Sequence, residues 1–256
     1  METRTKRRTA PARSGPVFSA PNATLVERRR GEGYARVWLA DIDGARSARP
    51  GQFIMVRRLG SPALPRAFSV LGVGPGRVEL FVKLDGLLRE LLGSAPLGTR
   101  FELRGPYGVP YEERIDPGPR YVLVGGGSGA APLLFLHERR PDLVSDLVLG
   151  FRHGGADDLF PALDLVVEAT SGQRASDRLA DVWRPGLGIV ACGPEPMLRT
   201  VGARYRGEPA VYVSLEARLG CGIGSCLGCS IPTAHGPRRI CRDGPLFACS
   251  ELPWLR

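Results

Sequence analysis

The sequence has no uninterrupted apolar run that approaches the ~18 residues a membrane-spanning helix requires. Its start also lacks the apolar segment of a secretory signal, because residues 1–13 carry five basic side chains against one glutamate. We find no internal repeat. We therefore expect no membrane span, a disordered basic tail over residues 1–18 and a cytoplasmic location.

A basic stripe with interleaved aromatic residues, typical of nucleic-acid-binding modules, is missing too. The formal net charge is +9, but about half of it comes from the tail and the rest is spread as arginine along the chain. We therefore expect no nucleic-acid partner. Phosphate-bearing cofactors would use some of these arginines.

Cysteine is scarce but clustered: four of the six cysteines lie between Arg218 and Phe247, with the spacing C-x4-C-x2-C-x11-C. Without a secretory signal, clustered thiols indicate metal or redox chemistry rather than disulfides. This spacing is typical of plant-type [2Fe–2S] ligation, and the glycines of CGIGSCLGC let the backbone wrap around an inorganic core. A four-thiolate zinc site is the alternative, although zinc ribbons usually pair two C-x2-C knuckles and one is present here. The candidate ligands are Cys221, Cys226, Cys229 and Cys241.

The chain divides into three parts by composition. Residues 19–115 contain strand-like segments bounded by turn residues and one helical insert, which predicts an antiparallel β-barrel. In residues 116–204, buried-strand runs alternate with helix-compatible segments, which predicts an α/β domain with a parallel sheet. Residues 205–256 are poor in apolar periodicity and rich in Gly, Pro and Cys, which predicts a small domain that folds around a metal centre. The predicted barrel strands are residues 34–40, 52–58, 67–73, 77–84 and 100–105.

Two glycine-containing turns in the second part are candidates for nucleotide contacts. VLVGGGSGAAPL, residues 122–133, places glycines between a strand and a helix, where a phosphate can approach the backbone. It is not a strict G-x-G-x-x-G fingerprint, and a tight structural turn is the alternative. ACGPEPM, residues 191–197, puts Cys192 at the carboxyl end of a strand, where α/β sheets bind ligands, with a buried unreactive thiol as the alternative.

Taken in order, the motifs resemble the ferredoxin–NADP reductase superfamily, and within it the electron-transfer subunits of NAD-dependent dihydroorotate dehydrogenases. The resemblance runs from about Asn22 to Phe247. The motifs that carry it are PGQF (50–53), RAFS (66–69), GPYG (105–108), GGGSGAAPL (125–133), LGFR (149–152), CGPEPM (192–197), SLEARLGCGIGSCLGC (214–229) and CRDGPLF (241–247).

The resemblance implies an FAD-binding barrel, an NAD-binding α/β domain and a small C-terminal [2Fe–2S] domain. The implied FAD contacts are Arg66, Ala67, Phe68, Ser69, Phe81, Val82, Lys83, Gly86 and Arg89. The implied NAD contacts are Gly125, Gly126, Gly127, Gly129, Cys192, Gly193, Pro194 and Met197. In this resemblance, the four clustered cysteines are the ligands of the iron–sulfur cluster, and Cys249 has no role. No acid–base side chain is required for catalysis. Cys192 is the one candidate for a catalytic residue near the nicotinamide.

The implied function is electron transfer in pyrimidine biosynthesis, from an FMN-containing dihydroorotate dehydrogenase catalytic subunit through [2Fe–2S] and FAD to NAD⁺. A separate partner is needed because a (β/α)8 catalytic barrel alone takes roughly 250 residues, so we expect a hetero-oligomer. One alternative is the same electron chain in a complex of the ferredoxin:NADP transhydrogenase or sulfide dehydrogenase type. Another is a regulatory or binding module that has lost its cofactors or is stabilised by zinc.

Two loops depart from the family pattern. GLLR, residues 86–89, stands where the family usually has G-x-G-T beside the flavin pyrophosphate, and Arg89 is a candidate for the missing phosphate contact. TSGQRASD, residues 170–177, replaces an acidic loop on the nucleotide side. The choice between NAD and NADP therefore stays open at this point.

Overall fold

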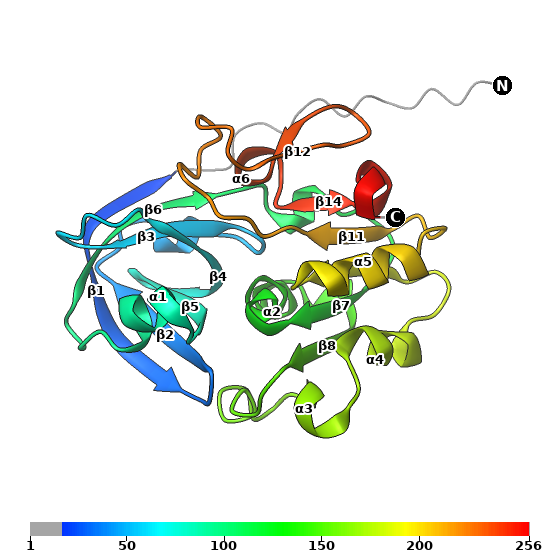
Figure 1. Cartoon of the computed structure of the whole chain (residues 1–256), viewed down its shortest axis with the longest axis horizontal. Helices are drawn as coiled ribbons and strands as arrows, with labels where there is room; N and C mark the ends of the chain where they lie inside the picture. Colours follow the sequence, from blue (N-terminus) through cyan, green and yellow to red (C-terminus); the bar gives the residue numbers. More distant parts are fainter. Residues whose placement is uncertain (1–16, 256) are drawn as a thin grey trace.

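The structure is a computed structural model that describes residues 17–255. Most of the predicted tail lies outside these residues, and Phe18 already begins the first strand. Six antiparallel strands close into a barrel in the order β1-β2-β5-β4-β3-β6 (Figure 1). Their bounds are β1 (Phe18–Arg30), β2 (Tyr34–Ala40), β3 (Phe53–Arg58), β4 (Arg66–Gly74), β5 (Arg77–Lys83) and β6 (Arg100–Tyr107).

Alternating apolar residues fill the interior of this barrel. In β2, Ala35, Val37 and Leu39 are fully buried, and neighbouring strands supply Leu80 and Leu103 to the same cluster. Every second side chain of a strand points to the same face, so a strand with one buried face needs an apolar residue at every second position. The five predicted strands are therefore confirmed to within two residues at each end.

Strand β1 is the barrel strand that the sequence did not predict. It contains Pro21 and Asn22, and its pairing with β6 is interrupted by a bulge between Ala20 and Ala23. Proline and a bulge both break the period-two pattern by which strands are predicted. The predicted helical insert is present as the short helix α1 (Gly86–Leu88) followed by a π-helical turn, η2 (Arg89–Gly93).

A six-stranded sheet in the order β14-β11-β10-β7-β8-β9 forms the second half of the molecule (Figure 1). Its strands are parallel except for β14, which pairs antiparallel with β11. The strand bounds are β7 (Tyr121–Gly126), β8 (Val144–Phe151), β9 (Leu165–Val167), β10 (Gly188–Cys192), β11 (Val211–Ser214) and β14 (Leu246–Ala248). The helix bounds are α2 (Ala130–Arg139), α3 (Glu168–Ser171), α4 (Ala175–Val182) and α5 (Glu195–Arg204).

Helices cover both faces of this sheet, as the alternation of strands and helices predicts. On one face, Leu133 and Leu136 of α2 pack with Leu123 of β7. On the other face, Leu179 of α4 and Leu198 of α5 share one apolar cluster with alternate residues of the same strands. Within residues 17–255, every helix is too short or too polar to span a membrane.

The last part of the chain is joined to the sheet at both of its ends. Strands β11 and β14 are hydrogen-bonded neighbours, and residues 215–245 leave the sheet between them and return to it. This excursion contains β12 (Ser230–Ile231), β13 (Arg238–Arg239) and α6 (Ile240–Asp243). The predicted boundaries 116–204 and 205–256 stay a prediction, and the sheet draws strands from both sides of residue 205.

The barrel and the sheet half are in close contact. Phe135 of α2 belongs to the apolar cluster of the barrel. Gly31, in the β1–β2 turn, lies so near Gly155 that a Cβ at Gly31 would be 1.8 Å from the Gly155 carbonyl oxygen. Arg36 of β2 donates from Nη1 to the Leu159 carbonyl at 3.0 Å. These contacts fix the width of the space between the two halves.

Candidate functional site

A cleft of about 590 Å³ lies between the barrel and the carboxyl edge of the parallel sheet. Three parts of the chain line it: the strands β3 to β5 of the barrel, the loops that follow β7, β8 and β10, and the excursion between β11 and β14. Ligands of open α/β sheets bind at this edge. The predicted residues that line the cleft are Ala67, Phe68, Ser69, Phe81, Val82, Lys83, Gly126, Gly127, Pro194 and Met197.

Other predicted contact residues do not line this cleft. They are Arg66, Gly86, Gly125, Gly129, Cys192 and Gly193. The side chain of Arg89, predicted to meet a phosphate, lies outside the described part of the structure. The cofactor contacts assigned to individual residues therefore stay predictions, and the cleft supports those on β4, β5 and the loop after β7 most directly.

The glycine turn after β7 serves packing as well as the cleft. A Cβ at Gly129 would lie 2.3 Å from the Cys192 carbonyl oxygen, so this glycine lets the turn approach the end of β10. Gly127 has a φ of +55° and faces the Tyr34 hydroxyl across the cleft, with 3.3 Å left for a Cβ. The turn thus brings the backbone of Gly126 and Gly127 to the cleft edge, where a phosphate can approach it.

Cys192 is a buried thiol. It lies in the apolar cluster that contains Tyr111 and Leu246, and burial, with a smaller contribution from the Glu216 carboxylate, raises its pKa far above the ordinary range. A thiol in this state is a poor nucleophile. The lining of the cleft at this turn comes from Pro194 and Met197 instead.

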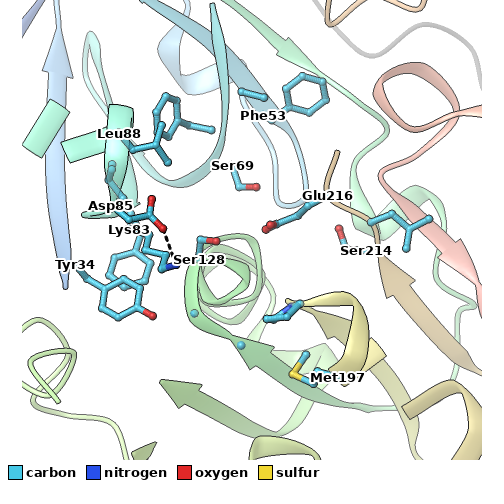
Figure 2. Close-up of a pocket in the computed structure, with 18 of the residues that line it drawn as sticks. Tyr34, Phe53, Ser69, Lys83, Asp85, Leu88, Ser128, Met197, Ser214 and Glu216 are labelled. Atoms are coloured by element: carbon cyan, nitrogen blue, oxygen red, sulfur yellow. Dashed lines mark ion pairs between the residues drawn. The ribbon is translucent and has the colours of Figure 1, made fainter. Parts of the chain in front are cut away.

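The barrel side of the cleft combines aromatic rings with polar groups. The ring of Phe81 stacks on that of Tyr34 with centroids 5.1 Å apart and 11° between planes. Lys83 forms an ion pair with Asp85 at 2.6 Å at the rim, shown as a dashed line in Figure 2. Flat apolar walls with a few placed polar groups are typical of cofactor sites.

Glu216 is a cleft residue for which the motifs predicted no role. Figure 2 shows its carboxylate and the Ser69 hydroxyl pointing toward one another from opposite walls. The side chain is open to the cleft, yet enclosure by the walls raises the pKa of its carboxyl group. The motif SLEARLGC, which places Glu216 between β11 and the first cysteine, was the available signal.

The four clustered cysteines form two pairs. The backbone N–H of Cys226 donates to the Cys221 sulfur at 3.5 Å, and the Cys229 and Cys241 sulfurs lie 3.3 Å apart. Although burial alone would raise it, the pKa of Cys221 is lowered to about 6 by backbone N–H groups of the loop. Burial and the neighbouring Cys229 raise the pKa of Cys241 to about 12.

This paired arrangement tests which metal centre the thiols fit. Within residues 17–255, no three histidine, cysteine, aspartate or glutamate side chains converge as a single metal ion requires. Two pairs match a two-iron cluster, in which each iron takes two protein ligands, better than one tetrahedral zinc ion. Cys249 takes no part in either pair and is a separate, half-buried thiol.

The cysteine loop also forms part of the cleft wall. Leu219 and Ile240 line the cleft, and they lie two residues before Cys221 and one residue before Cys241. On the outer face of the barrel, the loop packs on Met55 and Tyr107 at Gly222. The segments that carry Cys221 and Cys241 therefore also contribute side chains to the cleft.

Together the barrel, the nucleotide-type sheet and the adjoining cysteine loop define a flavin- and iron–sulfur-dependent reductase of the ferredoxin–NADP reductase type. The fold recurs in an NADH-dependent reduced ferredoxin-NADP oxidoreductase, with 25% identity, a TM-score of 0.74 and coverage of 91% of this chain and 90% of the other. It recurs also in an Amycolatopsis cytochrome P450 reductase, with 25% identity, a TM-score of 0.61 and coverage of 77% and 69%.

Sequence relatives define the family more narrowly. The iron-sulfur cluster binding domain of dihydroorotate dehydrogenase B matches residues 216–253. The dihydroorotate dehydrogenase B (NAD(+)) electron transfer subunit of Geobacillus thermodenitrificans is 34% identical over 81% of this chain and 88% of its own length. That of Caldanaerobacter subterraneus subsp. tengcongensis is 32% identical over 79% and 86%.

The chain belongs to the family of dihydroorotate dehydrogenase B electron transfer subunits. The predicted resemblance, fold class and oxidoreductase class are thereby confirmed. FAD, a [2Fe–2S] cluster and NAD are the cofactors of this family.

Proposed function

We propose that this protein carries electrons from an FMN-containing dihydroorotate dehydrogenase catalytic subunit to NAD⁺ in pyrimidine biosynthesis, as part of a hetero-oligomer. The relatives' names supply the partner and the pyridine nucleotide. A cytoplasmic location is part of the proposal, because free thiols persist in reducing compartments.

One observation carries the proposal: the paired thiols and the cleft share a wall. Leu219 and Ile240 face the cleft while the adjacent Cys221 and Cys241 belong to the two thiol pairs. A flavin, when bound, converts between the two-electron chemistry of nicotinamide and the one-electron chemistry of iron–sulfur centres. A site for that conversion needs both cofactors within a short distance, and the shared wall supports such an arrangement.

In this proposal, the residues of the cleft bind the cofactors and orient them. Phe53 and Phe68 offer apolar surface, and the Ser69 hydroxyl is directed into the space as a hydrogen-bond donor (Figure 2). Backbone groups of Gly126 and Gly127 stand where a dinucleotide phosphate approaches the sheet edge. Enclosure raises the pKa of the Glu216 carboxyl group, which faces the Ser69 hydroxyl across the cleft (Figure 2).

Reconstitution tests the proposal. The purified chain, loaded with FAD, iron and sulfide, is expected to reduce an artificial dye with NADH, and to couple dihydroorotate oxidation to NAD⁺ reduction when the catalytic subunit is added. Flavin and [2Fe–2S] absorption in the purified protein would exclude the zinc-stabilised and cofactor-free alternatives. Loaded protein without NADH:dye activity contradicts the proposal.

A different partner is the second candidate function. It is favoured by the likeness to the NADH-dependent reduced ferredoxin-NADP oxidoreductase, which covers 91% of this chain. The dihydroorotate dehydrogenase relatives are more similar in sequence, at 32–34% against 25% identity. NADH:dye activity without any coupling to the dihydroorotate-oxidising subunit would favour the second candidate.

A further inference from the structure

Glu168 places a carboxylate in the cleft at the edge-strand end of the parallel sheet. It directly follows β9, just as Arg152 directly follows β8, and both side chains line the cleft. Because Phe151 and Val167 are paired across these strands, the two residues leave the sheet at neighbouring positions. The Glu168 carboxylate reaches over the end of β8, where a Cβ on Gly150 would lie 3.4 Å from its Oε1.

The charges on this wall of the cleft have opposite signs and are not neutralised by ion pairs. Glu168 is half-buried and has no ion-pair partner among residues 17–255, and the same holds for the exposed Arg152. An arginine alone at this position would attract a phosphate group. A carboxylate on the same wall repels a phosphate but accepts hydrogen bonds from hydroxyl groups.

The order of the strands indicates which part of a dinucleotide reaches Glu168. The cysteine excursion joins the sheet at β11 and β14, whereas β8 and β9 form the opposite end (Figure 1). The glycine turn after β7, where a phosphate can approach the backbone, lies between these two ends. A nicotinamide that exchanges electrons with the flavin and the cysteine centre must point toward the excursion, so the adenosine half extends toward Glu168.

We propose that Glu168 selects NAD⁺ over NADP⁺ by accepting hydrogen bonds from the adenosine ribose hydroxyls and by repelling a 2′-phosphate. In dinucleotide-binding sheets, an acidic side chain commonly hydrogen-bonds the ribose of NAD. Selection by Glu168 rests on the proposed function, because that function supplies the orientation of the dinucleotide. The carboxylate stands two residues before the loop TSGQRASD, whose sequence left the choice between the two nucleotides open.

Dye reduction with each nucleotide tests this selection. For the FAD-loaded full chain, kcat/KM is expected to be at least about tenfold higher with NADH than with NADPH, because like charges in contact are strongly unfavourable. Glu168→Gln keeps the shape of the side chain and removes its charge, so this preference should fall by about tenfold. Asp164→Asn removes an equal charge just before β9, outside this cleft, and should leave the preference unchanged.

Three results would overturn the proposal. The first is a preference for NADH that survives in Glu168→Gln. The second is an equal loss of preference in Asp164→Asn, which would make the effect one of net charge. The third is a wild type that uses NADPH as well as NADH, which would make Arg152 rather than Glu168 the controlling residue.

A binding measurement gives an answer without turnover. Adenosine 2′,5′-bisphosphate carries the phosphate that distinguishes NADP⁺, and AMP lacks it. In calorimetric titrations of the loaded full chain, the wild type and Glu168→Asp, which keeps the charge, are expected to bind AMP more tightly than the bisphosphate. Glu168→Gln is expected to gain affinity for the bisphosphate. Equal affinities in the wild type, or a Glu168→Asp variant that behaves like Glu168→Gln, overturn the selection, whereas a wild type without NADH:dye activity refutes the proposed function.

Discussion

The ion pair between Arg36 of β2 and Glu79 of β5 offers a quantitative test of what stabilises the barrel and its contact with the sheet half. Nε of Arg36 lies 2.7 Å from Oε1 of Glu79, whose side chain is 7% exposed. The same guanidinium donates to the Leu159 carbonyl and lies 5.1 Å from the Phe160 ring centroid. Arg36→Met therefore removes a cross-molecule contact and leaves a buried carboxylate without its charged partner.

The expected cost follows from these contacts. Removing one partner of a fully buried pair costs about 3–5 kcal/mol, and Arg36 is 27% exposed, so we take the lower end, about 3 kcal/mol. For a chain of this size that corresponds to a fall in Tm of roughly 6–12 °C. Calorimetry of the apoprotein measures it, and the Arg36→Met, Glu79→Leu double variant is expected to recover part of the loss because no unpaired charge remains. A single variant within about 1 °C of wild type would refute the reasoning.

Three further outcomes are expected. Cys226→Ser should lose most of the bound iron and the [2Fe–2S] absorption, whereas Cys249→Ser should keep both, and iron and sulfide assays with visible spectra distinguish them. The pKa of Glu216 is higher in the folded chain than in the unfolded chain, so ionisation of this carboxyl group destabilises the fold. In urea melts, the wild type should therefore lose stability relative to Glu216→Gln as the pH rises from about 4 upward. A difference in stability that stays constant with pH would contradict this reasoning. Gly129→Ala should cost roughly 1–3 kcal/mol by crowding a backbone carbonyl, whereas Gly207→Ala, with no atom within 4 Å, should change thermal stability little.

The sequence predicted those parts of the fold that have a regular pattern. Short apolar-rich runs bounded by turn residues predicted the barrel strands. The cysteine spacing predicted a two-iron centre, which the two cysteine pairs support. Strands β11 and β14 were missed because strands of four and three residues are too short to show a period. Their pairing depends on contacts between residues far apart in the chain.

The candidate site was predicted in part, for a similar reason. Phe68, Ser69 and Lys83 lie in strands whose motif was recognisable, and they line the cleft. Cys192 shares a motif with true lining residues, but its side chain points into the core, and a motif does not specify side-chain direction. The pKa of Glu216 is raised by the surrounding walls of the cleft, to which both halves of the molecule contribute residues.

Because residues 215–245 begin and end at two strands that are hydrogen-bonded neighbours, both ends of the cysteine-bearing excursion are anchored to the sheet. It differs in this from carrier domains that swing on a flexible tether between donor and acceptor. A cluster held at both ends passes electrons to a partner at a rate set by how long the two proteins stay docked and by the distance between their cofactors. Adaptation to a new redox partner would therefore change the surface over the cysteine loop rather than a linker.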